Sequence, residues 1–155
     1  MRSVPVGLGE LRVSRSEDEQ LCVYGLGSCV AVYLYARGLV GLAHVVLPHK
    51  PASSGLGGEL GRYADVAIPN LVADIERLGV GRGQLQAAIA GGAAVLGFSS
   101  SIGDHNVIAV REELARFGIP VTQCDVGGER GRSVLFDART QHLDVRVLAT
   151  PVGAL

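Results

Sequence analysis

GLGSCVAVYLYARGLVGLAHVVL, residues 25–47, is the stretch that decides the fold. Its two halves, residues 29–35 and 39–47, are apolar runs rich in the β-branched and aromatic side chains that favour strands. Between them lies Arg37-Gly38, a pair that suits a short reversal of the chain. The stretch therefore predicts a β-hairpin whose pairing register is set by that turn.

The cysteine of this stretch, Cys29, follows a tight turn. A short apolar strand predicted over residues 21–24 stops at the glycines that come next, because so much glycine does not suit a strand interior. Glycines let the main chain approach a substrate closely, and successive N–H groups around Gly27 and Ser28 can stabilise an oxyanion or a thiolate. We therefore expect a lowered pKa for the Cys29 thiol, which makes it the candidate nucleophile.

The histidine of the same stretch, His44, lies on the return strand of the predicted hairpin. Reversal at the predicted turn pairs Cys29 with a residue near position 46, so His44 falls within one or two residues of the facing position. Side chains so placed lie about 4.5–8 Å apart, which permits a cysteine and its base to meet. Spacing alone also allows a plain alternative, in which Cys29 is a small core residue and His44 is a core histidine bonded to a backbone carbonyl.

The rest of the chain contains two helical patterns and further strands. Apolar residues recur at helical spacing over residues 64–78 and 106–117, and each pattern ends before a glycine. Pro69 lies inside the first pattern and predicts a kink or a restart of that helix. The further strands are expected over residues 85–90, 119–126, 133–136 and 142–148. Because each helix needs a sheet face to cover its apolar stripe, we predict an α/β fold with helices packed on a mixed sheet.

Composition limits the function. A chain of 155 residues with 48% hydrophobic content can bury one core, so residues 1–155 are expected to form a single domain. Fourteen basic and fifteen acidic residues give a net charge of −1, without a basic cluster for nucleic acid. No apolar stretch is long enough to enter a membrane, and the amino terminus lacks a leader pattern, so we expect a cytoplasmic protein. The three cysteines and four histidines show no metal-ligand spacing, so no metal is expected.

Two segments of the hairpin together resemble a known family. These are residues 25–32, GLGSCVAV, and residues 41–48, GLAHVVLP, and in combination they are similar to the CheD family of bacterial and archaeal chemotaxis proteins. The resemblance continues in order along nearly the whole chain. It includes Lys50, Gly58, Arg62-Tyr63-Ala64-Asp65, Ile89-Ala90-Gly91-Gly92-Ala93, Ile102-Gly103, Asn106, Gly127-Gly128, Arg130 and Arg132-Ser133-Val134.

The resemblance implies an enzyme that converts selected glutamines of chemoreceptors to glutamate. It assigns the nucleophile to Cys29 and the base to His44, in agreement with the turn and the hairpin, and it implies a cysteine thioester, a three-layer α/β/α sandwich and no cofactor. The implied partners are the cytoplasmic domains of chemoreceptors and a CheC-type phosphatase. We expect a monomer that makes transient contacts with them.

One position departs from the family pattern. The family leads us to expect a threonine six residues before the cysteine, as the third member that orients the histidine, but this chain has Val23. A valine side chain cannot accept a hydrogen bond, so the role would pass to the Val23 main-chain carbonyl. The alternative is a non-catalytic adaptor that keeps the fold and binds receptors or a CheC-type phosphatase.

Overall fold

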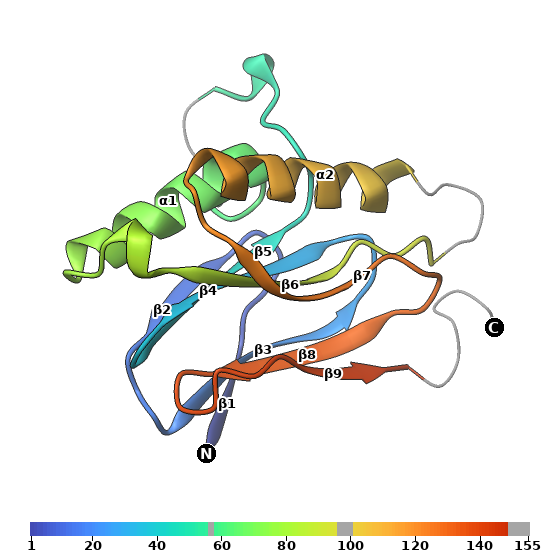
Figure 1. Ribbon diagram of the computed structural model, residues 1–155. Coiled ribbons are helices and arrows are strands. Elements are labelled where there is room, and N and C mark those ends of the chain that lie inside the picture. Colours follow the sequence, from blue (N-terminus) through green and yellow to red (C-terminus); the bar gives the residue numbers. More distant parts are fainter. Residues whose placement is uncertain (56–57, 96–100, 149–155) are drawn as a thin grey trace.

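The computed structural model describes residues 1–55, 58–95 and 101–148, and in this part of the chain it has an α/β fold (Figure 1). In chain order the strands and helices are β1 (Arg2–Pro5), β2 (Leu11–Ser14), β3 (Glu19–Leu26), β4 (Val30–Ala36), β5 (Leu39–Val45), α1 (Ala64–Arg77), β6 (Gln86–Gly91), α2 (Ser101–Arg116), β7 (Val121–Val126), β8 (Arg132–Asp137) and β9 (Asp144–Val147). Short 3-10 helices span Ala52–Ser54 and Arg82–Gln84.

The strands form two open sheets. The five-stranded sheet has the order β2-β5-β4-β6-β7, and the four-stranded sheet has the order β1-β3-β8-β9. Each sheet contains one parallel pair, β6 with β7 and β1 with β3, and the other pairs are antiparallel. The predicted mixed sheet is thus present, but the strands are divided between two sheets rather than gathered in one.

The layers differ from those that the family resemblance implies. Both helices pack on one face of the five-stranded sheet, and the four-stranded sheet lies against its other face (Figure 1). The order of layers is therefore α/β/β, and the second outer layer is a sheet instead of helices. Since α1 and α2 also contact each other on the same face, no helix of the described residues is left to cover the opposite one.

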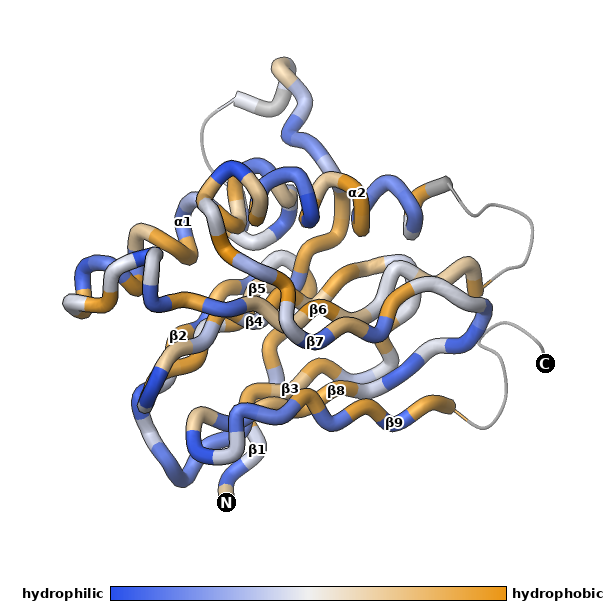
Figure 2. Tube along the Cα trace, in the orientation of Figure 1, coloured by the Kyte–Doolittle hydropathy of each residue, from blue (hydrophilic) through white to orange (hydrophobic). Residues whose placement is uncertain are grey.

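One hydrophobic core lies between the helices and the five-stranded sheet, and a second lies between the two sheets. Figure 2 shows apolar residues concentrated along the strands that line these cores. Val32 and Leu34 of β4 point to the helices, whereas Tyr33 points to the four-stranded sheet, as strand alternation requires. There the Tyr33 ring stacks on Phe136 with centroids 5.1 Å apart, and its hydroxyl donates to the Leu21 carbonyl at 2.9 Å. The central strand is thus buried on both faces.

The hairpin of β4 and β5 has the predicted turn. Ala36 pairs with Leu39 across Arg37-Gly38, where Gly38 has a φ of 73°. The register continues to Ala31, which faces His44 near the open end of the hairpin. This pairing places His44 within two residues of the position opposite Cys29, as the sequence predicts.

The helices follow the apolar spacing with one difference each. α1 runs without a break through Pro69 and ends before Gly79, whose φ is 89°, so the predicted restart does not occur. α2 begins at Ser101, five residues before the predicted start at Asn106. The strands predicted over residues 85–90, 119–126, 133–136 and 142–148 are present, with small changes at their ends.

Candidate active site

Cys29 and His44 line the same cavity, of about 390 Å³, which we call the Cys29 cavity. Its wall is formed by the end of β1 and the loop after it, by the end of β3 and the turn after it, and by the hairpin. The lining residues are Pro5, Val6, Gly7, Leu8, Val23, Tyr24, Gly25, Leu26, Gly27, Cys29 and His44. The cavity thus brings together the two residues that the sequence marks for catalysis.

Both side chains lie on the face of the hairpin that packs against the four-stranded sheet. His44 faces Ala31, and Cys29 is two residues before Ala31, so strand alternation puts the thiol and the imidazole on one side. Cys29 is half-buried against the core between the sheets, and His44 is only 6% exposed. The pair is therefore largely shielded from water.

The ring of His44 is held by a backbone carbonyl. Its Nδ1 lies 3.1 Å from the carbonyl oxygen of Val6. Because a carbonyl can only accept a hydrogen bond, Nδ1 carries the proton, and Nε2 of a neutral ring is left with its lone pair. This arrangement fixes the tautomer that a general base needs.

The acceptor is not the one that the sequence predicts. We expected the Val23 carbonyl, but the structure puts the Val6 carbonyl beside Nδ1. Val23 pairs with Val134 inside the four-stranded sheet, and it contributes to the wall of the cavity. The difference arises because β1 pairs in parallel with β3, which carries the end of β1 to the histidine.

Burial moves the two pKa values in opposite directions. Loss of hydration lowers the pKa of His44, against the opposing effects of the Val6 carbonyl and the Glu10 charge. Burial also raises the pKa of the Cys29 thiol, against the smaller effects of its own backbone N–H and of the Arg62 charge. The predicted lowering of the thiol pKa is therefore wrong. At neutral pH the site holds a neutral thiol beside a neutral imidazole.

The turn before Cys29 is fastened by its carbonyl groups. The Gly27 carbonyl accepts from the Ala93 N–H at 3.0 Å, and the Cys29 carbonyl accepts from the Gly92 N–H at 2.9 Å. Gly91, with a φ of 112°, lies so close that a Cβ atom there would collide with the Cys29 carbonyl. The Gly91-Gly92 pair thus serves close packing against the turn.

Asn106 is a residue of the site region that sequence reasoning did not assign to it. This buried side chain of α2 donates from Nδ2 to the carbonyls of Ser28 and Val46, both at 2.9 Å. It thereby ties together the two chain segments at the open end of the hairpin. The available signal in the sequence was a polar residue at helical spacing from the apolar positions Val110 and Leu114, which are buried with it.

The other cysteines and histidines are not grouped into a metal site within the described residues. Among the described residues there is no group of three or more His, Cys, Asp or Glu side chains placed to hold a metal ion. Cys22 is buried in β3 and Cys124 is exposed on β7. Within the described ranges, neither helix has the length and apolar content needed to cross a bilayer.

Known proteins resemble this chain along almost its full length. The family model described as CheD chemotactic sensory transduction matches residues 46–147. A Clostridium kluyveri protein named probable chemoreceptor glutamine deamidase CheD is 35% identical over 155 residues, which cover 96% of this chain and 94% of the relative. A Clostridium botulinum protein of the same name has the same identity and coverage. Each alignment leaves about 4% of this chain uncovered.

Proposed function

The chain belongs to the CheD family, and from this premise we propose that it is a chemoreceptor glutamine deamidase whose nucleophile is Cys29 and whose base is His44. One observation carries the assignment of the two residues. They line one cavity, and the Val6 carbonyl holds Nδ1 of His44 so that Nε2 can receive a proton. His44 lies on β5, and Cys29 directly precedes β4.

In the first half of the proposed reaction, Nε2 of His44 takes the thiol proton while Sγ of Cys29 attacks the side-chain carbonyl carbon of glutamine. The carbonyl oxygen becomes an oxyanion, which the N–H groups around Gly27, Ser28 and Cys29 stabilise. The imidazolium then gives its proton to the departing nitrogen. The C–N bond breaks, ammonia leaves and a thioester remains on Cys29.

In the second half, neutral His44 takes a proton from water as the water oxygen attacks the thioester carbon. The C–S bond breaks, the thiol regains its proton from the imidazolium, and the side chain leaves as glutamate. The Val6 carbonyl supports both halves because it accepts from Nδ1–H and stabilises the imidazolium whenever it forms.

The resting protonation states agree with this sequence of steps. Burial raises the pKa of the thiol and lowers the pKa of the imidazole, so the proton starts on sulfur and moves only as the new bond forms. A thiol in a shielded cavity is also protected from unspecific reactions with solutes. We propose that this restricts the chemistry to a bound glutamine side chain.

The proposed function is tested by incubating the protein with the cytoplasmic domains of chemoreceptors from its own genome. Peptide mass spectrometry should detect conversion of glutamine to glutamate at defined positions. Cys29→Ala should abolish the conversion, whereas Cys124→Ala, which removes an exposed cysteine of β7, should leave it unchanged. Equal modification by the wild type and by Cys29→Ala would refute the role of Cys29.

The non-catalytic adaptor was suggested by the absence of a threonine at Val23. The structure places the Val6 carbonyl beside Nδ1 of His44, so the ring has an acceptor without a threonine hydroxyl. The argument for the adaptor is therefore weaker. We therefore propose the enzyme over the adaptor. If receptors bind the wild type and Cys29→Ala equally and neither modifies them, the adaptor is the correct function.

The partners follow from the same proposal. We propose that the protein acts as a monomer in the cytoplasm on receptor cytoplasmic domains, and that a CheC-type phosphatase also binds it. The names of the relatives support the chemoreceptor as substrate. The monomer, the cytoplasmic location and the phosphatase rest on the expectations drawn from the sequence. Size-exclusion chromatography with light scattering should give a monomer alone and a heteromeric complex with the phosphatase.

A further inference from the structure

The loop between β1 and β2, residues 6–10, is bound to His44 at three points. The His44 N–H donates to the Glu10 carbonyl at 3.1 Å, and the Gly9 N–H donates to the His44 carbonyl at 3.0 Å. The third point is the ring, where Nδ1 meets the Val6 carbonyl. The loop is thus fixed to the backbone and to the side chain of the same residue.

The carboxylate of Glu10 turns back into its own loop. Its Oε1 accepts from the Gly7 N–H at 2.6 Å, while the Glu10 N–H donates to the Gly7 carbonyl at 3.0 Å. Gly9 completes the turn with a φ of 74°, which other residues adopt only with strain. A Cβ atom on Gly7 would lie 2.5 Å from Oε1, so glycine leaves room for the carboxylate.

The two contacts meet on one peptide group. The carbonyl that holds His44 belongs to Val6, and the N–H that Glu10 accepts belongs to Gly7, so a single peptide unit joins the imidazole to the carboxylate. We infer that Glu10 is a positioning residue for His44, acting through the peptide group between Val6 and Gly7. This inference rests on the proposed function and adds the residue that orients its base.

The physical basis is polarisation along a chain of hydrogen bonds. A peptide N–H that donates to a carboxylate pushes electron density toward its own carbonyl oxygen, which then accepts more strongly from Nδ1–H. No proton moves through the peptide, and the proton that is exchanged in the reaction stays at Nε2. The Glu10 side chain is exposed, so water weakens its direct field and the hydrogen-bonded route gains in importance.

Glu10 takes the place of the side chain that the family pattern leads us to expect. Val23 cannot accept a hydrogen bond, and its main chain is engaged in the four-stranded sheet. The loop after β1 instead brings a carbonyl to Nδ1 and a carboxylate behind it. The carboxylate of a catalytic triad orients its histidine directly, whereas here it acts through one peptide unit.

Few other charges face His44. Within the cavity the titratable neighbours are Cys29 and Tyr24. Outside it, Arg62 acts on Cys29 and is paired with Glu59 at 3.8 Å. Among the described residues, the charge that shifts the pKa of His44 is that of Glu10, which raises this pKa against the larger opposing effect of burial.

Two variants of Glu10 separate the charge from the hydrogen bond. Glu10→Gln keeps an oxygen for the Gly7 N–H but removes the charge, whereas Glu10→Ala removes both. We expect kcat to fall about tenfold or more in Glu10→Ala and less in Glu10→Gln, with KM unchanged in both, because misplacement of a catalytic group reduces turnover at this scale. The acid limb of the rate should move to lower pH in both variants.

Glu17→Gln, on the exposed loop before β3, is the matched control and should have the rate and pH profile of the wild type.

A second readout needs no substrate. In a Cys29→Ala background, the ring of His44 is titrated by NMR with and without Glu10→Gln, and the imidazole pKa should fall when the charge is removed. If the wild type deamidates receptors but Glu10→Gln and Glu10→Ala change neither the rate nor this pKa, the positioning role is refuted. If no receptor is modified but the pKa still falls, the link to Glu10 holds and the proposed function fails.

Discussion

At the scale of single residues, the location of one proton governs the site. Burial of Cys29 and His44 favours the uncharged form of each, so the resting pair is thiol and imidazole instead of thiolate and imidazolium. In the proposed reaction, such a thiol depends on a base that is neutral and correctly oriented. The carbonyl of Val6 provides the orientation, and burial provides the neutrality.

The pH dependence of the reaction follows from the imidazole. In the proposed reaction His44 must be neutral to accept the thiol proton, and its pKa is lowered from the ordinary value of about 6.5. Activity should therefore fall as the pH decreases through a midpoint below about 6.5, and it should be full at neutral pH. The measurement is kcat/KM for a receptor domain between about pH 4.5 and 9. A midpoint above the ordinary value would contradict the effect of burial.

The position of the missing threonine can be tested by restoring it. In Val23→Thr, the new hydroxyl enters a site that is 2% exposed, while Nδ1 of His44 is already bonded to the Val6 carbonyl. We expect no gain in kcat and a loss of about 1 kcal/mol in the free energy of unfolding, because a buried hydroxyl without a partner is costly. Assays on a receptor domain and urea unfolding give the two values. An increase in kcat would show that the hydroxyl, and not the carbonyl, suits His44.

The residues of the site divide by how far apart they lie in the sequence. Cys29 directly precedes the hairpin and His44 lies on its return strand, so turn position and residue type were enough to predict that both would lie in the same region. Val6 and Glu10 reach His44 from a distant segment through a parallel strand pair. A backbone carbonyl has no residue code, so the sequence offered only the position of the expected threonine, Val23, as a guide to the acceptor.

At the scale of elements, α2 controls the open end of the hairpin. Asn106 donates to the Ser28 carbonyl before β4 and to the Val46 carbonyl after β5. Cys29 directly precedes β4, and His44 lies on β5. The start of α2 lies very close to the chain after β6. A Cβ atom on Gly103 would lie only 2.6 Å from the Gly92 carbonyl oxygen. The first turn of α2 serves this contact more than an apolar stripe, so periodicity alone placed the start of the helix too late.

Removal of the amide should loosen the hairpin. Asn106→Ala leaves two carbonyls without their donor, and each buried polar group that loses its partner costs about 1–3 kcal/mol. We expect the free energy of unfolding to fall by about 2–4 kcal/mol and kcat to fall more than KM rises. Asn70→Ala, in which an amide of α1 loses one contact to the Val66 carbonyl, is the milder control. Urea unfolding and receptor assays at a temperature where both variants are folded would show whether the loss in kcat is specific to Asn106.

At the scale of the whole molecule, the site lies where the chain passes from one sheet to the other. β1 leads into β2 through residues 6–10, and β3 leads into β4 through residues 27–29, and both connections line the Cys29 cavity. Apolar patterning predicts which strands are buried, but it does not say which sheet a strand joins. The strands were therefore predictable from the sequence. The α/β/β layers, and the passage of both connections from one sheet to the other, were not.

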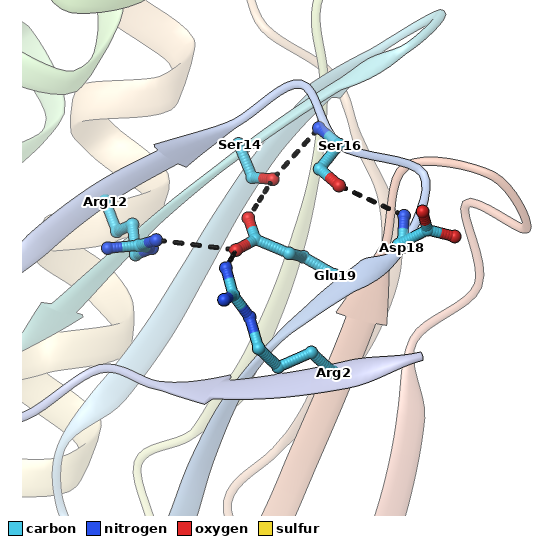
Figure 3. A network of polar contacts seen from close by, with 6 residues as sticks. All are labelled: Arg2, Arg12, Ser14, Ser16, Asp18 and Glu19. Carbon is cyan, nitrogen blue, oxygen red and sulfur yellow. Dashed lines mark hydrogen bonds and ion pairs between the residues drawn. The ribbon is translucent and has the colours of Figure 1, made fainter.

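The opposite ends of β1 and β3 are joined to β2 by a polar cluster around Glu19 (Figure 3). Its carboxylate accepts from Arg2 and from the Ser14 hydroxyl at 2.8 Å, and Arg12 lies 3.6 Å away. These contacts connect the four-stranded sheet to the edge of the five-stranded sheet. They lower the pKa of Glu19, mainly through the hydrogen bond from Arg2 and then through that from Ser14.

The cluster predicts a specific dependence of stability on pH. A carboxylate with a lowered pKa stabilises the fold above its unfolded pKa of about 4.3, and the stabilisation is lost as the pH falls through the folded pKa. Glu19→Gln should therefore unfold at a lower temperature than the wild type at pH 7, and this gap should narrow as the pH falls below the unfolded pKa of about 4.3. Asp18→Asn, in the exposed loop beside it, should show no such gap. Because the cluster lies away from the Cys29 cavity, receptor deamidation by folded Glu19→Gln should equal that of the wild type. A difference in unfolding temperature of the same size at pH 7 and at low pH would contradict the ion pairing.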